Sequence, residues 1–149
     1  MTPLDLTQHP PRSCRAEVDG IIFLPRAIDK VRATLPGGNI GSYLNLKDEI
    51  PTLSGLFYRR MRITHEEFAS AVASAESDAD VAAWLRARID DRAVEKFTAQ
   101  LLSIRLGGIP EEGRPALQAY YRAAKQAPDD MLLVDLIDAD DAAAFAGRV

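Results

Sequence analysis

The sequence predicts an all-α protein, an irregular bundle of six or seven helices with an extended arm at its N-terminal end. Apolar residues recur at helical spacing in most segments from residue 24 onward. Prolines, glycines and short polar side chains separate these segments, as expected where helices end and begin. The short apolar run at residues 21–24 has no convincing second strand to pair with, so no sheet is expected.

Length and composition indicate one folded domain. The chain has 149 residues, of which 47% are hydrophobic and 27% are charged, as is usual for a globular protein. No stretch rich in Gly, Ser or Pro divides the chain. We therefore expect a single helical domain over residues 1–149, with residues 1–20 forming an arm that packs on the helical body.

The arm is predicted from its prolines and from the lack of any sustained periodicity before residue 21. Leu4 and Leu6 alternate with polar residues, so both leucines can enter a groove of the body. The first helix then lies between Pro25 and Pro36, because proline suits a first helical turn and cannot continue a helix. Its apolar residues fall on one side, and a charged outer face carries Arg26, Asp29, Lys30 and Arg32.

Residues 37–43 are predicted to connect two helices. Glycine-rich loops that hold phosphate follow a strand and open a helix, whereas this one follows a helix and lacks the Gly-Lys-Ser/Thr ending. The next helix covers residues 52–62, and its final turn carries Arg59, Arg60 and Arg62. This basic end is the best local candidate for contacting an anion, although cations at a helix C-terminus also need no ligand.

Three further helices begin at polar caps. Thr64 and Glu67 form a capping box for a helix whose buried residues include Phe68 and Val72. Ser77 or Asp78 caps the next helix. Asp90 and Asp91 cap a longer helix that is expected to bury Val94, Phe97, Leu101 and Ile104 and to end at Gly107-Gly108.

Two helices are expected in the remaining chain. Pro115 opens a helix that ends before Pro128 and buries Leu117, Tyr120, Tyr121 and Ala124. The apolar run 131–137 is buried, the aspartates at 138, 140 and 141 form a helix cap on solvent, and residues 142–145 complete a last helical turn or two.

Charge and cysteine content limit the classes of function. The formal net charge of −4 argues against a dedicated nucleic-acid binder, which needs a basic surface. The one cysteine cannot form an intramolecular disulfide, the N-terminal residues do not resemble a signal peptide, and no apolar stretch is long enough to span a bilayer. We expect a cytoplasmic protein that binds neither nucleic acid nor membrane.

Several short patterns together resemble a known family. They are Asp5-Leu6-Thr7, Pro10-Pro11-Arg12-Ser13, Gly20, Leu24-Pro25-Arg26-Ala27-Ile28-Asp29-Lys30-Val31-Arg32-Ala33 and Gly41-Ser42-Tyr43. In identity and in spacing they resemble the bacterial domain of unknown function family numbered 5069. The resemblance implies a small bacterial helical protein and brings no activity, substrate or cofactor.

Metal and catalytic sites have little support in the sequence. His65-Glu66-Glu67 lacks the second histidine that a zinc-protease helix needs, since position 69 is Ala69. The aspartates near residue 140 could hold magnesium, but such sites usually need a bound phosphate. Cys14 has only His9, on the arm, as a nearby base. No catalytic residue, metal or cofactor is predicted.

The candidate ligand site is an anion site at the start of the first helix. Arginines beside helix N–H groups hold carboxylate or phosphate well. The candidate residues are Arg12, Ser13, Arg15, Arg26, Lys30 and Tyr43, with Asp29 and Arg32 as structural ion-pair residues. The alternative is that these arginines pair internally, with Asp29, Asp5 or the acidic tail, and attach the arm to the body.

The function predicted from these features is a non-enzymatic binding or regulatory module whose partner is a protein or a small anionic ligand. A homo-oligomer is left open. The alternative is a small enzyme that acts on a phosphorylated or carboxylated metabolite, with Arg12, Arg26 and Lys30 binding the substrate.

Overall fold

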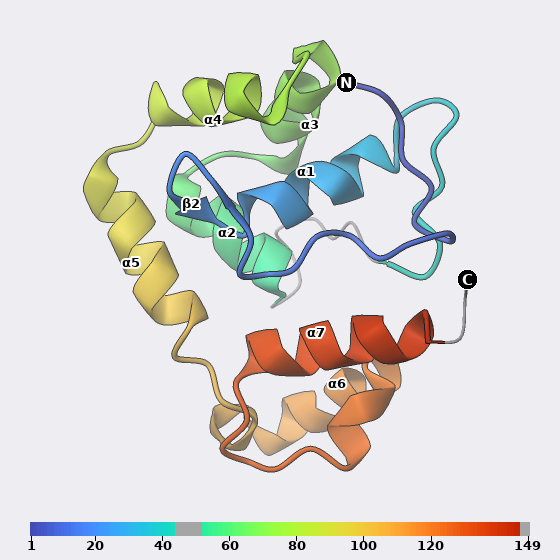
Figure 1. Cartoon of the computed structure of the whole chain (residues 1–149). Coiled ribbons are helices and arrows are strands. Elements are labelled where there is room, and N and C mark those ends of the chain that lie inside the picture. The colour runs from blue at the N-terminus through green and yellow to red at the C-terminus, as the bar shows by residue number, and fades with distance from the viewer. Residues whose placement is uncertain (44–51, 147–149) are drawn as a thin grey trace. The chain divides into compact units, whose positions relative to one another are not determined.

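The computed structural model describes residues 1–43 and 52–146 and is mostly helical, with seven α-helices in these ranges (Figure 1). The predicted all-α class is confirmed, because the one sheet in the described residues has two strands of two residues each. The chain divides into two compact units, residues 1–98 and residues 99–149. Each unit has its own internal packing, and the single domain expected over residues 1–149 stays a prediction.

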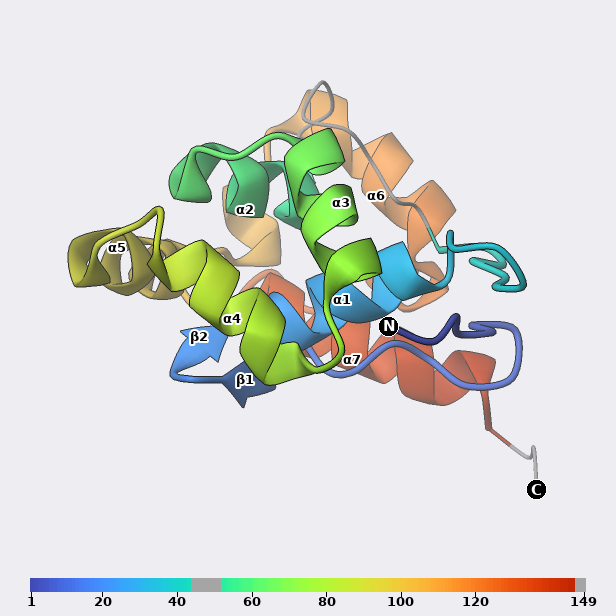
Figure 2. The same cartoon turned by 90° about the horizontal axis from the view of Figure 1, so that it is seen from above.

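The first unit contains the arm, the sheet and the first helices. In chain order its elements are β1 (Glu17–Val18), β2 (Ile21–Ile22), α1 (Leu24–Arg32), α2 (Leu53–Met61), α3 (His65–Ser74), α4 (Asp78–Arg86) and most of α5 (Asp91–Leu101). Strands β1 and β2 form an antiparallel hairpin beside α4, as Figure 2 shows. The expectation that the run 21–24 has no partner was wrong. Its partner strand lies within the arm, across an Asp19-Gly20 turn whose positive φ angles of 51° and 73° suit a two-residue hairpin.

Helix α1 is buried on nearly all sides. Residues 24–29 are all buried, and even Arg26 and Asp29 are only 5% and 4% exposed. The expected charged face exists, and it turns toward the arm and not toward water. The arm covers it, with Arg32 Nε donating a hydrogen bond to the Thr2 carbonyl oxygen at 2.8 Å.

The arm is fixed by backbone pairing with the connector at residues 37–43. Asp5 and Asn39 form an isolated parallel bridge, and the Leu6 N–H donates to the Asn39 carbonyl oxygen at 2.7 Å. Leu6 is 1% exposed, as expected for a residue in a groove of the body, and Leu4 is half-buried. The connector turns at Gly37, whose φ of 89° is costly for residues with a side chain.

Phe57 is the centre of an aromatic core in the first unit. Its ring centroid lies 5.7 Å from that of Phe23, 5.6 Å from that of Phe68 and 5.5 Å from that of Phe97. All four rings are at most 1% exposed. Phe57, Phe68 and Phe97 lie on α2, α3 and α5, and Phe23 directly precedes α1. The aromatic core therefore joins these four helices.

The predicted helix starts in this unit are confirmed. Thr52 Oγ1 accepts a hydrogen bond from the Gly55 N–H at the start of α2. Capping boxes open α3, between Thr64 and Glu67, and α4, between Ser77 and Asp80. Each box satisfies two backbone N–H groups that the helix itself leaves without partners.

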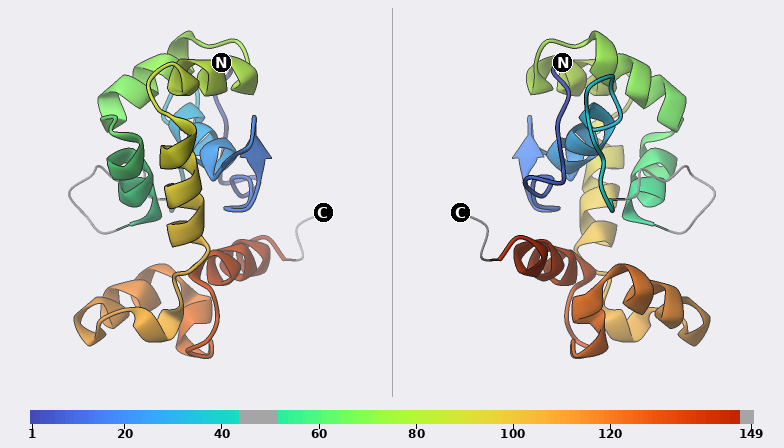
Figure 3. Two further views of the ribbon diagram at one scale, coloured as in Figure 1. Left: turned by 90° about the vertical axis from the view of Figure 1, so that its left-hand side faces the viewer. Right: turned by 90° about the vertical axis from the view of Figure 1, so that its right-hand side faces the viewer.

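The second unit contains α6 (Arg114–Tyr120), α7 (Leu133–Ala144) and three short 3-10 helices, η1 (Leu106–Gly108), η2 (Glu111–Gly113) and η3 (Arg122–Lys125), drawn in orange and red in Figure 3. Helix α7 packs against η3, where the Ala123 N–H donates to Asp140 Oδ1 at 3.3 Å. The prediction that the aspartates at 138, 140 and 141 form a helix cap on solvent was wrong. All three lie inside α7, and Asp141 is buried.

Two helices end earlier than predicted. Helix α5 ends at Leu101 rather than near Gly107, because residues 104–106 bond to another segment, with the Leu133 N–H donating to the Ile104 carbonyl oxygen at 2.8 Å. Helix α6 ends at Tyr120 and not near Pro128, since Tyr121 is extended. Of the four residues expected to be buried there, only Ala124 is, and Tyr120 is 52% exposed.

Candidate anion-binding site

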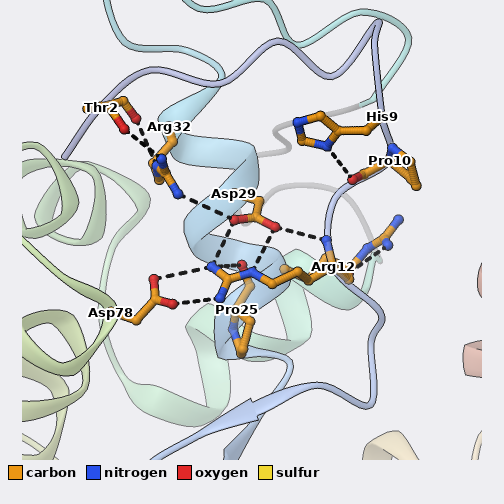
Figure 4. Close-up of polar contacts among 9 residues, drawn as sticks. Thr2, His9, Pro10, Arg12, Pro25, Asp29, Arg32 and Asp78 are labelled. Atoms are coloured by element: carbon orange, nitrogen blue, oxygen red, sulfur yellow. Dashed lines mark hydrogen bonds and ion pairs between the residues drawn. The ribbon is translucent and has the colours of Figure 1, made fainter.

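Arg12 binds two carboxylates, one from α1 and one from α4. Its Nη2 lies 2.8 Å from Asp29 Oδ1, and its Nη1 lies 2.6 Å from Asp78 Oδ2 (Figure 4). The Arg12 backbone N–H also donates to Asp29 Oδ2 at 2.9 Å. Hydrogen bonding to Asp78, and then to Asp29, raises the pKa of Arg12 above its ordinary value despite the opposing effect of burial. This residue attaches the arm to the helical body.

Arg26 lies next to this cluster and is almost fully buried. Its Nη1 donates to the Arg12 carbonyl oxygen at 3.2 Å, and its Cζ lies 5.8 Å from the centroid of the Tyr43 ring. A guanidinium over an aromatic face gains electrostatic attraction from the ring. The structure thus brings together three of the predicted site residues, Arg12, Arg26 and Tyr43.

The other predicted residues lie around this cluster in different settings. Lys30 Nζ donates to the buried Ser54 Oγ at 3.0 Å. Arg15 is exposed, and its backbone N–H donates to Ser13 Oγ at 3.1 Å, which is a local turn contact. Arg32 Nη1 lies 4.0 Å from Asp29 Oδ1. For Arg12 the structure shows the internal ion pair with Asp29, while the role of the cluster in binding an anion stays a prediction.

A second group of cations lines a surface groove of about 430 Å³ in the first unit. We call this hollow the basic groove. Its cationic side chains come from the end of α2 and from the segment that leads into α5; they are Arg59, Arg60, Arg62, Arg88, Arg92 and Lys96. All six are exposed, and Asp90 is the only acidic residue among the described residues that line the groove.

The first wall of the basic groove is the C-terminal end of α2. Arg62 adopts the left-handed conformation with φ 54°, and its N–H donates to the Arg59 carbonyl oxygen at 3.2 Å. The Ile63 N–H donates to the Tyr58 carbonyl oxygen at 3.1 Å, so the chain turns sharply after the helix. The left-handed residue at this position is arginine and not the more usual glycine.

The second wall is the start of α5 and the residues before it. Asp90 Oδ1 accepts a hydrogen bond from the Ala93 N–H at 2.9 Å and so caps the helix. Arg92 and Lys96 are four residues apart on α5, which places them on one face. A positive side chain in the first helical turn is disfavoured by the helix dipole, so Arg92 is not explained by helix stability.

Arg88 is held in place by Trp84. Its Cζ lies 4.2 Å from the centroid of the Trp84 ring, and its Nη1 donates to the Trp84 carbonyl oxygen at 2.8 Å. Within the part of the chain that the structure describes, the other N–H groups of this guanidinium have no protein acceptor, so they can donate to a ligand in the groove. A fixed guanidinium loses less conformational entropy when it binds a ligand than a free one does.

Most cations of the basic groove are not neutralised by protein carboxylates. Within residues 1–43 and 52–146, no ion pair involves four of them: Arg62, Arg88, Arg92 and Lys96. Like charges gathered on one surface repel each other and attract anions. With Asp90 counted against them, these four side chains give the groove a local charge of +3.

Sequence reasoning found one wall of this groove and missed the other. It identified the basic end of α2 as a place to contact an anion, but it did not connect that end with the second wall. The pattern Arg88, Arg92, Lys96 repeats every four residues and was visible in the sequence. What the sequence did not show is that the two segments face the same hollow.

Metal-binding geometry is absent from the residues that the structure describes, in which no group of three or more His, Cys, Asp or Glu side chains could hold an ion. Glu67 is occupied by the capping box. His65 packs its ring against Tyr58, with centroids 5.6 Å apart.

None of the helices in the described ranges is both long and apolar enough to cross a bilayer.

A family model matches most of the chain. The family model described as "Domain of unknown function (DUF5069)" matches residues 8–143. No curated protein matches the chain.

Proposed function

Because this chain belongs to the DUF5069 family, which is defined without an activity, we propose a function from its surface: it is a non-enzymatic binding module that holds an anionic ligand in the basic groove. The observation that supports this proposal is the pair of cationic walls, with four side chains that no described carboxylate neutralises. A volume of about 430 Å³ falls within the range of small-molecule sites.

The lining of the basic groove favours binding over catalysis. The described residues that line it include no Ser, Cys, His or Tyr that could act as a nucleophile or general base. Its one carboxylate, Asp90, is used to cap α5. The groove can attract, orient and hold an anion, and Lys96 is the one side chain left among its described residues that is of a type able to transfer a proton.

The cluster around Arg26 has a different role in this proposal. Arg12 is committed to Asp29 and Asp78, so it attaches the arm rather than binding a ligand. We therefore place the anion ligand at the basic groove. Because all cations of the groove belong to one chain, binding in it does not require a homo-oligomer. A cytoplasmic location fits a protein whose single cysteine, Cys14, is buried and not part of a disulfide.

Isothermal titration calorimetry with sodium triphosphate and citrate tests the proposal. At 50 mM salt we expect at least one of the two anions to bind with a Kd of about 1 mM or tighter, and the double variant Arg62→Ala/Arg92→Ala to lose about tenfold or more in affinity. Arg122→Ala is the matched control, because Arg122 is exposed on η3, outside the groove. Binding that the double variant and Arg122→Ala reduce equally, or that does not occur, would overturn the proposal.

A further inference from the structure

We propose that the ligand of the basic groove is a compact anion with two or more phosphoryl groups and no nucleobase, an inference that rests on the anion-binding function proposed above. Three features of the groove support this ligand: the two-walled arrangement of cations, the match of charge, and the lack of a surface for an aromatic or apolar group.

The two walls favour phosphoryl groups over carboxylates. Arg62 belongs to the end of α2, whereas Arg88 and Arg92 belong to the segment that enters α5. A carboxylate is planar and accepts an arginine fork within its plane, whereas a tetrahedral phosphoryl group presents three oxygens in different directions. A phosphoryl group can therefore accept hydrogen bonds from both walls at once, and two such groups can extend along the groove.

The local charge fits about two phosphoryl groups. Four cations of the groove and Asp90 sum to +3, without counting Arg59 and Arg60. Each phosphoryl group carries about −1.5 to −2 at pH 7, so two groups bring roughly −3 to −4. A single phosphate would leave part of the repulsion between the cations in place.

The lining does not offer a surface for a base or another large apolar group. Its apolar residues are Met61, Ile89 and Ala93, of which Met61 is 1% exposed. None of the described residues that line the groove is aromatic. Trp84, which contacts Arg88, already has that guanidinium over its ring at 4.2 Å. The neighbouring hollow on the other side of Arg88 is lined by acidic residues as well as Trp84, namely Glu66, Glu67 and Asp80, which repel phosphate.

Calorimetric titration with four probes at equal ionic strength tests the inference. The probes are pyrophosphate, inorganic phosphate, citrate and ADP. Citrate carries about three carboxylates and so matches pyrophosphate roughly in charge, while ADP adds a nucleoside to the same two phosphoryl groups. We expect pyrophosphate to bind about tenfold or more tightly than phosphate or citrate, and ADP to bind no more tightly than pyrophosphate.

Single variants test the two-walled arrangement. Arg62→Ala and Arg92→Ala each remove one wall's contact and are expected to weaken pyrophosphate binding about tenfold, with a smaller loss for inorganic phosphate. Arg62→Lys keeps the charge but loses the guanidinium fork, so its affinity should fall between those of the wild type and Arg62→Ala. Circular dichroism shows whether each variant is folded. The Arg122→Ala control shows what the loss of an arginine outside the groove does to binding.

The outcomes separate this inference from the proposed function. Citrate binding as tightly as pyrophosphate would overturn the phosphoryl class but leave anion binding intact. ADP binding tenfold more tightly than pyrophosphate would show a site for the nucleoside and overturn the compact ligand. Failure of all four probes to bind would overturn the inference and the proposed function together.

Discussion

The rings of Phe57 on α2 and Phe97 on α5 meet edge to face with their centroids 5.5 Å apart, and this contact holds the two helices that carry the walls of the basic groove. Arg59–Arg62 follows Phe57 within two turns of helix, and Lys96 directly precedes Phe97. The core thus determines which cations face each other on the surface.

Phe97→Ala is expected to destabilise the protein by about 3–5 kcal/mol, since it removes a fully buried ring from the aromatic core and leaves a cavity. Urea denaturation followed by circular dichroism measures the change. Tyr120→Ala is the control, because Tyr120 is 52% exposed and its loss should change the free energy of unfolding by less than about 0.5 kcal/mol. Equal effects of the two substitutions would contradict the core described above.

Asp29→Ala should lower stability by roughly 1–3 kcal/mol, because it removes a buried acceptor of hydrogen bonds from the Arg12 side chain and backbone. The loss is limited, since the Arg12 side chain is 38% exposed and keeps Asp78. Asp91→Ala provides the comparison: its side chain is 91% exposed in its ion pair with Arg86, so less than about 1 kcal/mol is expected. Limited proteolysis of the arm should increase only in the Asp29 variant.

Thr64→Ala should cost about 1 kcal/mol through the loss of the capping box at the start of α3. Thr64→Ser keeps the hydroxyl that accepts from the Glu67 N–H and should retain most of the stability. The midpoint of urea unfolding checks both variants. An alanine variant as stable as the wild type would show that the box contributes nothing in solution.

Acid should loosen the turn at Asp5. Hydrogen bonds from the Thr7 hydroxyl and the Thr7 N–H lower the pKa of Asp5 below its ordinary value of 3.8. The folded pKa lies below the unfolded one, so the stabilisation is present above the unfolded value and is lost as pH falls through the folded pKa. Carboxyl titration by NMR should show the pKa of Asp5 rising in Thr7→Val and staying low in Thr7→Ser.

Binding in the basic groove should weaken as salt increases. The groove is exposed, so its attraction for an anion is screened over a Debye length of about 10 Å at 0.1 M salt. Triphosphate affinity measured by calorimetry should fall steadily as sodium chloride rises from about 50 to about 300 mM. Affinity that does not depend on salt would indicate binding at a site other than these cations.

Local features of the fold were predictable because neighbouring residues produce them. Thr64 and Glu67 are three residues apart and close a capping box without help from the rest of the chain. The Asp19-Gly20 turn is equally local, because an Asp-Gly pair by itself favours a two-residue hairpin. The early end of α5 was not predictable in this way, because residues 104 and 106 form backbone hydrogen bonds with Leu133 and Met131, which are distant in the sequence. After α6, the Ala123 N–H likewise donates to the distant Asp140.

The sequence by itself determined the helical class, the capped helix starts and the basic end of α2, since helical periodicity, caps and runs of arginine depend on residues within a few positions of each other. Only the tertiary structure decided that Arg26 is buried, that Arg12 pairs with Asp29 and Asp78, and that Arg88, Arg92 and Lys96 face the end of α2. These relations join segments up to 66 residues apart. They depend on how apolar faces pack together, which the local pattern of a sequence leaves open.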